Sequence, residues 1–268
     1  MSGRAEEWVF AGADLRARLF NPPSGRGSDL LVTFRPRLDG AAGFDRPEPV
    51  RRFLRRGWSH LYLQSRVNDW YLNAETEAFA DRLRSLTEGF AYRVAIGFSM
   101  GGYAALRFSR ALRLDHLVAV SPQVSLAASV APFENRYPEA ADFDRELGDL
   151  ARHGWHDLAG TVLYDPFRRL DRLHAEAIGL LFPRLDFARM VFGGHPATTV
   201  LRETVGFGAV QDLILERRAG RSEILALHRR HREHAPSYWS ECAAACARHG
   251  RPEVERAALA CQAALAAG

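Results

Sequence analysis

Hydrophobic positions along the chain alternate between the two-residue period of strands and the longer period of helices. Because strands that alternate with helices pair in parallel through right-handed crossovers, this pattern predicts an α/β fold, with a mostly parallel central sheet and helices on both faces. The first two runs are expected as an opening hairpin or as edge strands. The predicted strands cover 8–10, 15–20, 29–34, 58–64, 92–96, 116–120, 161–164 and 188–192, and the predicted helices cover 49–56, 75–86, 104–112, 173–181 and a stretch from 198.

Two segments depart from this alternation. Residues 123–159 are too many for a bare loop and include prolines and aromatics, so they are interpreted either as a partly helical cap over the site or as a crossover helix with irregular ends. The last residues, 236–268, predict two helices joined by a glycine turn. The expected organisation is a main domain over 1–235 and a C-terminal helical hairpin that docks on this domain or on a partner protein.

A serine flanked by glycines follows the predicted strand 92–96. The segment 97–101, GFSMG, leads from that strand into a small-residue helical pattern. A serine on so tight a strand-to-helix turn leaves no room for side chains two residues before and after it, which accounts for both glycines. The pattern favours a nucleophilic hydroxyl at Ser99 over an ordinary Gly/Ser turn.

A serine nucleophile needs a histidine base and a carboxylate that orients the histidine. His195 lies on a loop just past the predicted strand 188–192 and is the candidate base. Asp165 follows the strand 161–164 directly, and Pro166 ends that strand, so Asp165 is predicted as the acid. The rival, Asp171, precedes an amphipathic pattern and is interpreted as a helix N-cap.

Ser99, Asp165 and His195, in this chain order and each after a predicted strand, resemble the catalytic residues of the α/β-hydrolase superfamily over about residues 8 to 218. The resemblance implies that Ser99 attacks an acyl carbon, His195 takes the serine proton, Asp165 steadies the imidazolium, and water later releases the acyl group. No cofactor is expected, and the sequence has no zinc-ligand spacing, so no metal is expected either. Esterase, thioesterase, amidase and acyltransferase activities all remain open.

Acyl transfer also requires two backbone N–H groups that bind the oxyanion. Met100, the residue after the nucleophile, is expected to supply the first. The second is expected where the strand 29–34 ends, and because Pro36 has no N–H, the donor is predicted to be Phe34 or Arg35. The His-Gly-Gly-Gly loop of lipase-like relatives is absent from the sequence.

The loop after the strand 58–64 carries Trp70 and Tyr71 beside asparagine and aspartate side chains. Flat apolar rings next to fixed polar groups suit the wall of a substrate pocket. The alternative is a loop that leads into a helix, with Trp70 covering the sheet edge. Trp70 and Tyr71 are therefore candidate substrate-binding residues.

Composition narrows the remaining classes of function. All 36 basic residues are arginines, and 32 acidic residues oppose them, so the net charge of +4 does not favour a nucleic-acid partner. No apolar run reaches membrane-spanning length, and residues 1–7 lack the apolar core of a signal peptide, so a cytoplasmic location is expected. The cysteines Cys242 and Cys246, one helical turn apart, are expected to pack as small apolar side chains.

These patterns together predict a serine hydrolase that acts on a small-molecule ester, thioester or amide through a covalent acyl-enzyme. The alternative is a non-catalytic protein with the same fold, which binds partners through residues 123–159 or through the C-terminal hairpin. The presence of all three triad candidates favours the enzyme, because a binding scaffold has no physical need for them.

Overall fold

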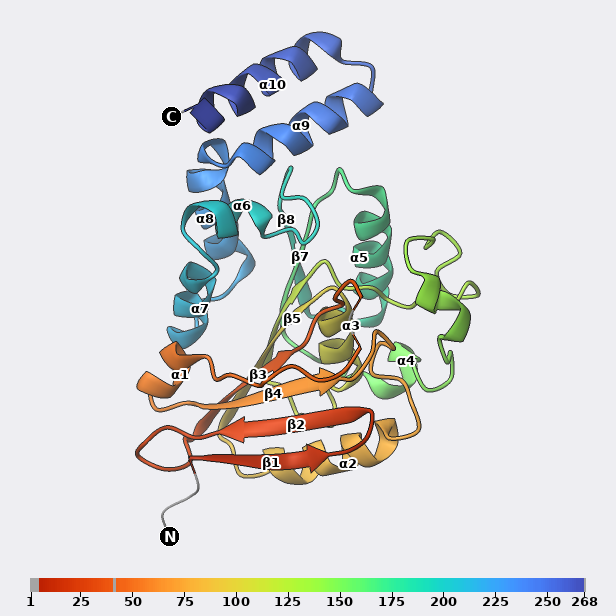
Figure 1. Ribbon diagram of the computed structural model, residues 1–268, viewed down its shortest axis with the longest axis vertical. Coiled ribbons are helices and arrows are strands. Elements are labelled where there is room, and N and C mark those ends of the chain that lie inside the picture. Colours follow the sequence, from red (N-terminus) through yellow and green to blue (C-terminus); the bar gives the residue numbers. More distant parts are fainter. Residues whose placement is uncertain (1–4, 41, 268) are drawn as a thin grey trace.

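The computed structural model describes residues 5–40 and 42–267; residues 1–4, part of the N-terminal stretch assessed for a signal peptide, lie outside the described residues. Its centre is an eight-stranded sheet in the order β1-β2-β4-β3-β5-β6-β7-β8 (Figure 1). The strands are β1 (Glu6–Ala11), β2 (Leu15–Phe20), β3 (Asp29–Phe34), β4 (Ser59–Ser65), β5 (Tyr92–Phe98), β6 (His116–Val120), β7 (Gly160–Tyr164) and β8 (Leu185–Arg189).

Pairing within the sheet confirms the predicted arrangement. β1 pairs with β2, and β2 with β4, in antiparallel fashion, so the first two strands form the expected edge hairpin. All pairs from β4 and β3 through β8 are parallel. The last strand ends at Arg189, three residues earlier than the apolar run 188–192 predicted, so a longer loop leads to His195.

Helices cover both faces of the sheet, as predicted (Figure 1). One face packs against α2 (Thr76–Thr87), α3 (Met100–Arg107) and α5 (Arg169–Leu181), which contribute Phe79, Tyr103 and Ile178 to the larger apolar core. The other face packs against α1 (Arg51–Arg55), α6 (Thr199–Thr204), α7 (Gly208–Leu215) and α8 (Arg221–His231). Both faces of the parallel strands are thereby buried, which explains their continuous apolar runs.

The segment between β6 and β7 has little regular structure. It contains the 3₁₀ helix η1 (Pro138–Asp142) and the short helix α4 (Leu150–His153), and it runs past the carboxyl end of β5 on its way to β7. Its interpretation as a cap stays a prediction.

The C-terminal helices α9 (Pro236–Arg248) and α10 (Pro252–Ala267) form the predicted hairpin, which follows the short 3₁₀ helix η2 (Arg232–His234). Glu241 of α9 pairs with Arg168, and Tyr238 packs on Phe192, so α9 lies against the main body of the molecule (Figure 1). Cys242 is buried with alanines of both helices, as expected for a small apolar side chain. A boundary at residue 236 and a protein partner of this hairpin stay predictions. Among the described residues, no helix combines the length and apolarity that crossing a membrane requires.

Candidate active site

Ser99 stands on a strained turn between β5 and α3. Its backbone angles, φ 49° and ψ −117°, lie in a region that residues with a side chain rarely adopt. A Cβ atom on Gly97 would lie 2.3 Å from the carbonyl oxygen of Gly101, and one on Gly101 would lie 3.0 Å from the Cβ atom of Phe34. The predicted steric need is therefore confirmed at Gly97, where a Cβ atom would overlap backbone, whereas at Gly101 the space is tight.

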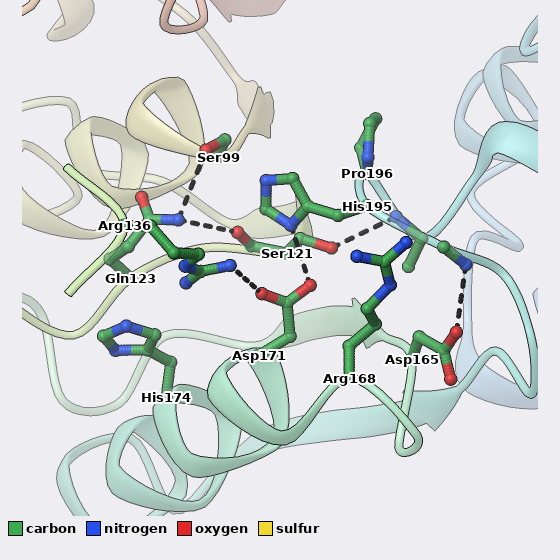
Figure 2. Close-up of polar contacts among 12 residues, drawn as sticks. Ser99, Ser121, Gln123, Arg136, Asp165, Arg168, Asp171, His174, His195 and Pro196 are labelled. Atoms are coloured by element: carbon green, nitrogen blue, oxygen red, sulfur yellow. Dashed lines mark hydrogen bonds and ion pairs between the residues drawn. The ribbon is translucent and has the colours of Figure 1, made fainter. Parts of the chain in front are cut away.

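Ser99 and His195 line one cavity of about 570 Å³. Ser99 comes from the start of α3 and His195 from the loop after β8 (Figure 2). Within the described residues they share no direct hydrogen bond; the Ser99 hydroxyl accepts from the amide Nε2 of Gln123 at 3.2 Å and lies 3.4 Å from the hydroxyl of Tyr137. The other lining residues are Pro36, Arg37, Leu38, Asp39, Phe98, Arg136, Tyr137, Pro196, Thr198, Arg202 and Phe207.

The carboxylate beside His195 belongs to Asp171. Its Oδ2 atom lies 2.7 Å from Nδ1 of His195, and its Oδ1 atom accepts a hydrogen bond of 2.6 Å from Arg136 (Figure 2). Burial alone raises the pKa of Asp171, but the hydrogen bonds and charges of His195 and Arg136 outweigh burial, so the net pKa lies below its usual value. Asp171 is therefore an anion held against the imidazole.

Asp165 does not reach His195, and this corrects the sequence-based choice of the acid. Its two oxygens accept hydrogen bonds from the backbone N–H groups of Phe167, at 2.9 Å, and Gly194, at 3.0 Å. The carboxylate thus fixes the turn after β7 and the loop that precedes His195. Burial raises its pKa to about 6, and the two backbone hydrogen bonds only partly offset that effect.

The interpretation of Asp171 as an N-cap is also wrong. Helix α5 begins at Arg169, so Asp171 lies in its first turn, where its side chain turns toward the site instead of capping the helix. The N-cap position is Arg168, which makes no capping hydrogen bond. The sequence signal that could have identified Asp171 is an acidic residue in the first turn of the helix that follows β7. From that turn a side chain reaches the same edge of the sheet as the residues at the end of the strand.

The predicted oxyanion donors fare differently. Met100 is the first residue of α3, so its N–H has no partner within the helix. The N–H of Arg35 donates to the carbonyl of Leu63 at 2.9 Å, which removes Arg35 as a donor. Phe34 belongs to β3, and the cavity lining on this loop begins only at Pro36. The next N–H along the loop belongs to Arg37, which lines the cavity.

Trp70 and Tyr71 lie in the protein interior, and neither side chain is exposed to a substrate. The hydroxyl of Tyr71 lies 3.0 Å from the carbonyl oxygens of Arg35 and Leu63 and so secures the end of β3. The indole Nε1 of Trp70 donates to Gln123 at 3.3 Å, and its ring packs on Tyr137 at 5.0 Å. Trp70 and Tyr71 therefore lie behind the residues that surround Ser99 and support them. The prediction that they line the substrate pocket themselves is wrong.

No family model matches the sequence, and no curated protein sequence matches it either. Two structures of the capsule O-acetyltransferase of Neisseria meningitidis serogroup A are similar to the chain, with TM-scores of 0.50 and 0.51 and identities of 14% and 12%. Each comparison covers 77% of this chain and 93% of the other. Est1E from Butyrivibrio proteoclasticus has a TM-score of 0.49, an identity of 11%, and coverages of 83% and 98%.

Likeness at this level of identity concerns the fold. The parallel sheet with an antiparallel edge hairpin, and the turn from β5 into α3, are those of the α/β-hydrolase fold, and this chain has that fold. The capsule O-acetyltransferase structures share this fold.

Proposed function

We propose that the protein is a serine hydrolase that forms a covalent acyl-enzyme at Ser99. The observation that carries the proposal is the short hydrogen bond from His195 to the buried Asp171, beside a cavity that His195 shares with a serine on a strained turn. A histidine held by a buried carboxylate and facing a nucleophile is the arrangement that acyl transfer requires. Esters, thioesters and amides all fit this chemistry.

In the proposed mechanism, Nδ1–H of His195 donates to Asp171, which leaves Nε2 free to accept the Ser99 proton. The serine oxygen then forms a bond to the acyl carbon, the bond from that carbon to the leaving group breaks, and the leaving group takes the proton from Nε2. Water then gives a proton to Nε2 and its oxygen bonds to the acyl carbon; the bond from the acyl carbon to Ser99 breaks, and Nε2 returns the proton to the serine oxygen. Ser99 and His195 need to approach each other for this step, and such hydrogen bonds commonly tighten only when substrate binds.

The oxyanion that develops on the acyl oxygen is assigned to backbone donors at the two sides of Ser99. The N–H of Met100 is one, and its place at the start of α3 adds the positive end of the helix dipole. Arg37 is the proposed second donor, because Arg35 is engaged in the sheet and Pro36 has no N–H.

A fluorophosphonate probe tests the proposal directly, because it labels a serine only when a base activates it. We expect labelling of the wild-type protein and none of Ser99→Ala, with unchanged circular dichroism for both. Ser85→Ala is the matched control, since Ser85 is exposed on α2, and it should label as the wild type does. Equal labelling of Ser99→Ala and wild type would show that Ser99 is not the nucleophile.

The non-catalytic alternative predicts a different result from the same experiment. A protein that uses this fold only to bind partners should show no labelling of any variant and no hydrolysis of an activated ester. That outcome would contradict the hydrolase proposal and favour the non-catalytic binding protein.

A further inference from the structure

A network of hydrogen-bonded side chains extends behind Asp171, in which the guanidinium of Arg136 is 26% exposed. Arg136 donates to Asp171 with one arm of its guanidinium and to Glu134 with Nε and the other arm, at distances of 2.6 to 3.1 Å. Glu134 in turn lies 2.7 Å from Nε2 of His174. The side chains of Glu134 and His174 are fully buried, and Asp171 is almost so. In Figure 2, Arg136 and His174 both lie to the left of Asp171, on the side away from Arg168.

His174 does not contribute a charge to this network. Its Nδ1 accepts a hydrogen bond of 3.1 Å from the backbone N–H of Val124, so its single proton is on Nε2, where it is donated to Glu134. Burial lowers the pKa of His174, which keeps the ring neutral. Hydrogen bonds from His174 and Arg136 outweigh burial at Glu134 and lower its pKa to about 2, so Glu134 is an anion.

The charged groups of this network are the carboxylates of Asp171 and Glu134 and the guanidinium of Arg136. Together they carry a net charge of −1 behind His195, which is the same net charge as that of Asp171 alone. Arg136 alone would cancel Asp171, and a neutral pair stabilises an imidazolium less than an anion does. Glu134 restores the lost negative charge, and its own position is fixed by His174.

We propose that Glu134, Arg136 and His174 are positioning residues that keep one net negative charge and a fixed carboxylate behind His195. The inference rests on the proposed function, in which His195 becomes positively charged during each turnover. The hydrogen bond from Arg136 fixes the orientation of the Asp171 carboxylate. Glu134 balances the positive charge of the Arg136 guanidinium. Glu134 and Arg136 also precede Tyr137, which contacts Ser99, so one short segment of the 123–159 region touches both the nucleophile and the acid.

Other charged groups also face this site, and the test leaves them unchanged. Arg168 and Glu241 form a pair beside Gly194, and Arg37, which lines the cavity, pairs with Asp39 and Glu139. Arg202 of α6 lines the cavity, and Asp165 lies behind the loop that carries His195. Because these groups are the same in every variant, a difference between variants reports the network.

Nuclear magnetic resonance titration of His195, with its signal assigned from His195→Ala, measures the charge balance without any substrate. Glu134→Gln leaves the network neutral, so we expect the titration midpoint to fall by about one pH unit. Arg136→Gln leaves two carboxylates and should move the midpoint upward. The double variant Glu134→Gln/Arg136→Gln leaves Asp171 alone and should return the midpoint to that of the wild type.

The controls come from an exposed pair on the same helix as Asp171. Arg172→Gln and Glu176→Gln make the same chemical changes in an ion pair of 2.7 Å that faces solvent, and neither should move the midpoint. Kinetics add a second readout: the midpoint of the kcat/KM profile should shift in the same directions, with about a tenfold lower kcat/KM for Glu134→Gln at pH 7.

The outcomes separate the two proposals. If His195 titrates identically in the wild type and in both folded single variants, or if the double variant does not restore the midpoint, the network proposal is overturned even when Ser99 labels normally. If the midpoints shift as expected but Ser99 does not label, the charge balance stands and the proposed hydrolase function is overturned. Should Glu134→Gln not fold, the upward shift of Arg136→Gln still decides.

Discussion

The turn after β7 and the first turn of α5 each hold a buried aspartate, and the two carboxylates differ in every contact. Asp165 is held by backbone N–H groups, no cation or imidazole of the described residues bonds to either of its oxygens, and burial raises its pKa to about 6. Asp171 faces the imidazole of His195 and the guanidinium of Arg136, and its pKa is lowered. A place at the strand tip therefore does not by itself bring a carboxylate to the histidine; Asp171, seven residues beyond β7, is the one that contacts His195.

The two aspartates also divide one task between them. Asp165 holds Gly194 and so sets the path of the loop, whereas Asp171 holds the ring of the next residue, His195. Ser121 supports the same loop from β6, because its hydroxyl accepts the N–H of Ala197 at 3.1 Å (Figure 2). Loop position and ring orientation thus depend on different side chains, and substitutions should separate them.

The largest effect should come from His195→Ala. We expect it to lower turnover of an activated ester by roughly 10⁶-fold, about as far as Ser99→Ala, because members of a triad act as one unit. Adding Asp171→Asn to His195→Ala should cost little more, since Asp171 then has no ring to orient. The check is kcat for the single and double variants, and full additivity of the two losses would separate Asp171 from the catalytic unit.

Asp171→Asn alone should lower kcat by about 10⁴-fold, because the amide favours the wrong imidazole tautomer. Asp165→Asn should cost only about tenfold or less, through a small displacement of the loop. Steady-state kinetics at pH 7 compare the two variants, with fluorophosphonate labelling rates as a second measure. The reverse ranking would return the acid to Asp165.

The contributions of Asp165 and Asp171 to the unfolding free energy should change with pH in opposite directions. Asp165 binds its proton more tightly in the folded protein, so its protonated form favours folding at low pH, and this contribution is lost as the pH rises from about 4 to about 6. Relative to Asp165→Asn, the wild type should lose up to about 3 kcal/mol of unfolding free energy over that range. Urea denaturation at pH 4 and pH 7 measures it.

The contribution of Asp171 to the unfolding free energy should decrease as the pH falls, in contrast to that of Asp165. Its folded pKa is lowered, so its contribution is present above the unfolded value of about 3.9 and is lost as the pH falls below it. The wild type should therefore lose stability relative to Asp171→Asn only below about pH 4. If the difference in unfolding free energy from the wild type changed with pH in the same way for both variants, the two aspartates would not have the different pKa shifts inferred from their contacts.

The smallest effect is expected at Arg168, which lies in the sequence between the two aspartates. Its guanidinium pairs with Glu241 but remains 43% exposed, and an ion pair so open to solvent contributes little. Arg168→Gln should lower the unfolding free energy by less than about 1 kcal/mol and leave kcat within about threefold. Thermal melts and ester kinetics check it, and a loss of turnover near that of Asp171→Asn would place Arg168 in the site.

Local sequence patterns determined the sheet, the helices on both faces and the turn that carries Ser99. Each of these depends on residues close together in the chain: the apolar runs of β3, β5 and β6, and the glycines that leave space around Ser99. His195 was found in the same way, as a histidine on the loop after the last strand. All of these features follow from short-range sterics and burial.

Tertiary structure decided what depends on atoms that are distant in the chain. Asp165 and Asp171 are six residues apart in the printed sequence, and the helical backbone of α5, with Arg136 approaching from another segment, selects which carboxylate meets His195. The same holds for Arg35, whose N–H is used by β4, and for Trp70, whose indole supports Gln123 from inside the core. Hydrogen bonds and burial between separate elements are set only when the chain packs, because a residue's neighbours in space are not its neighbours in sequence.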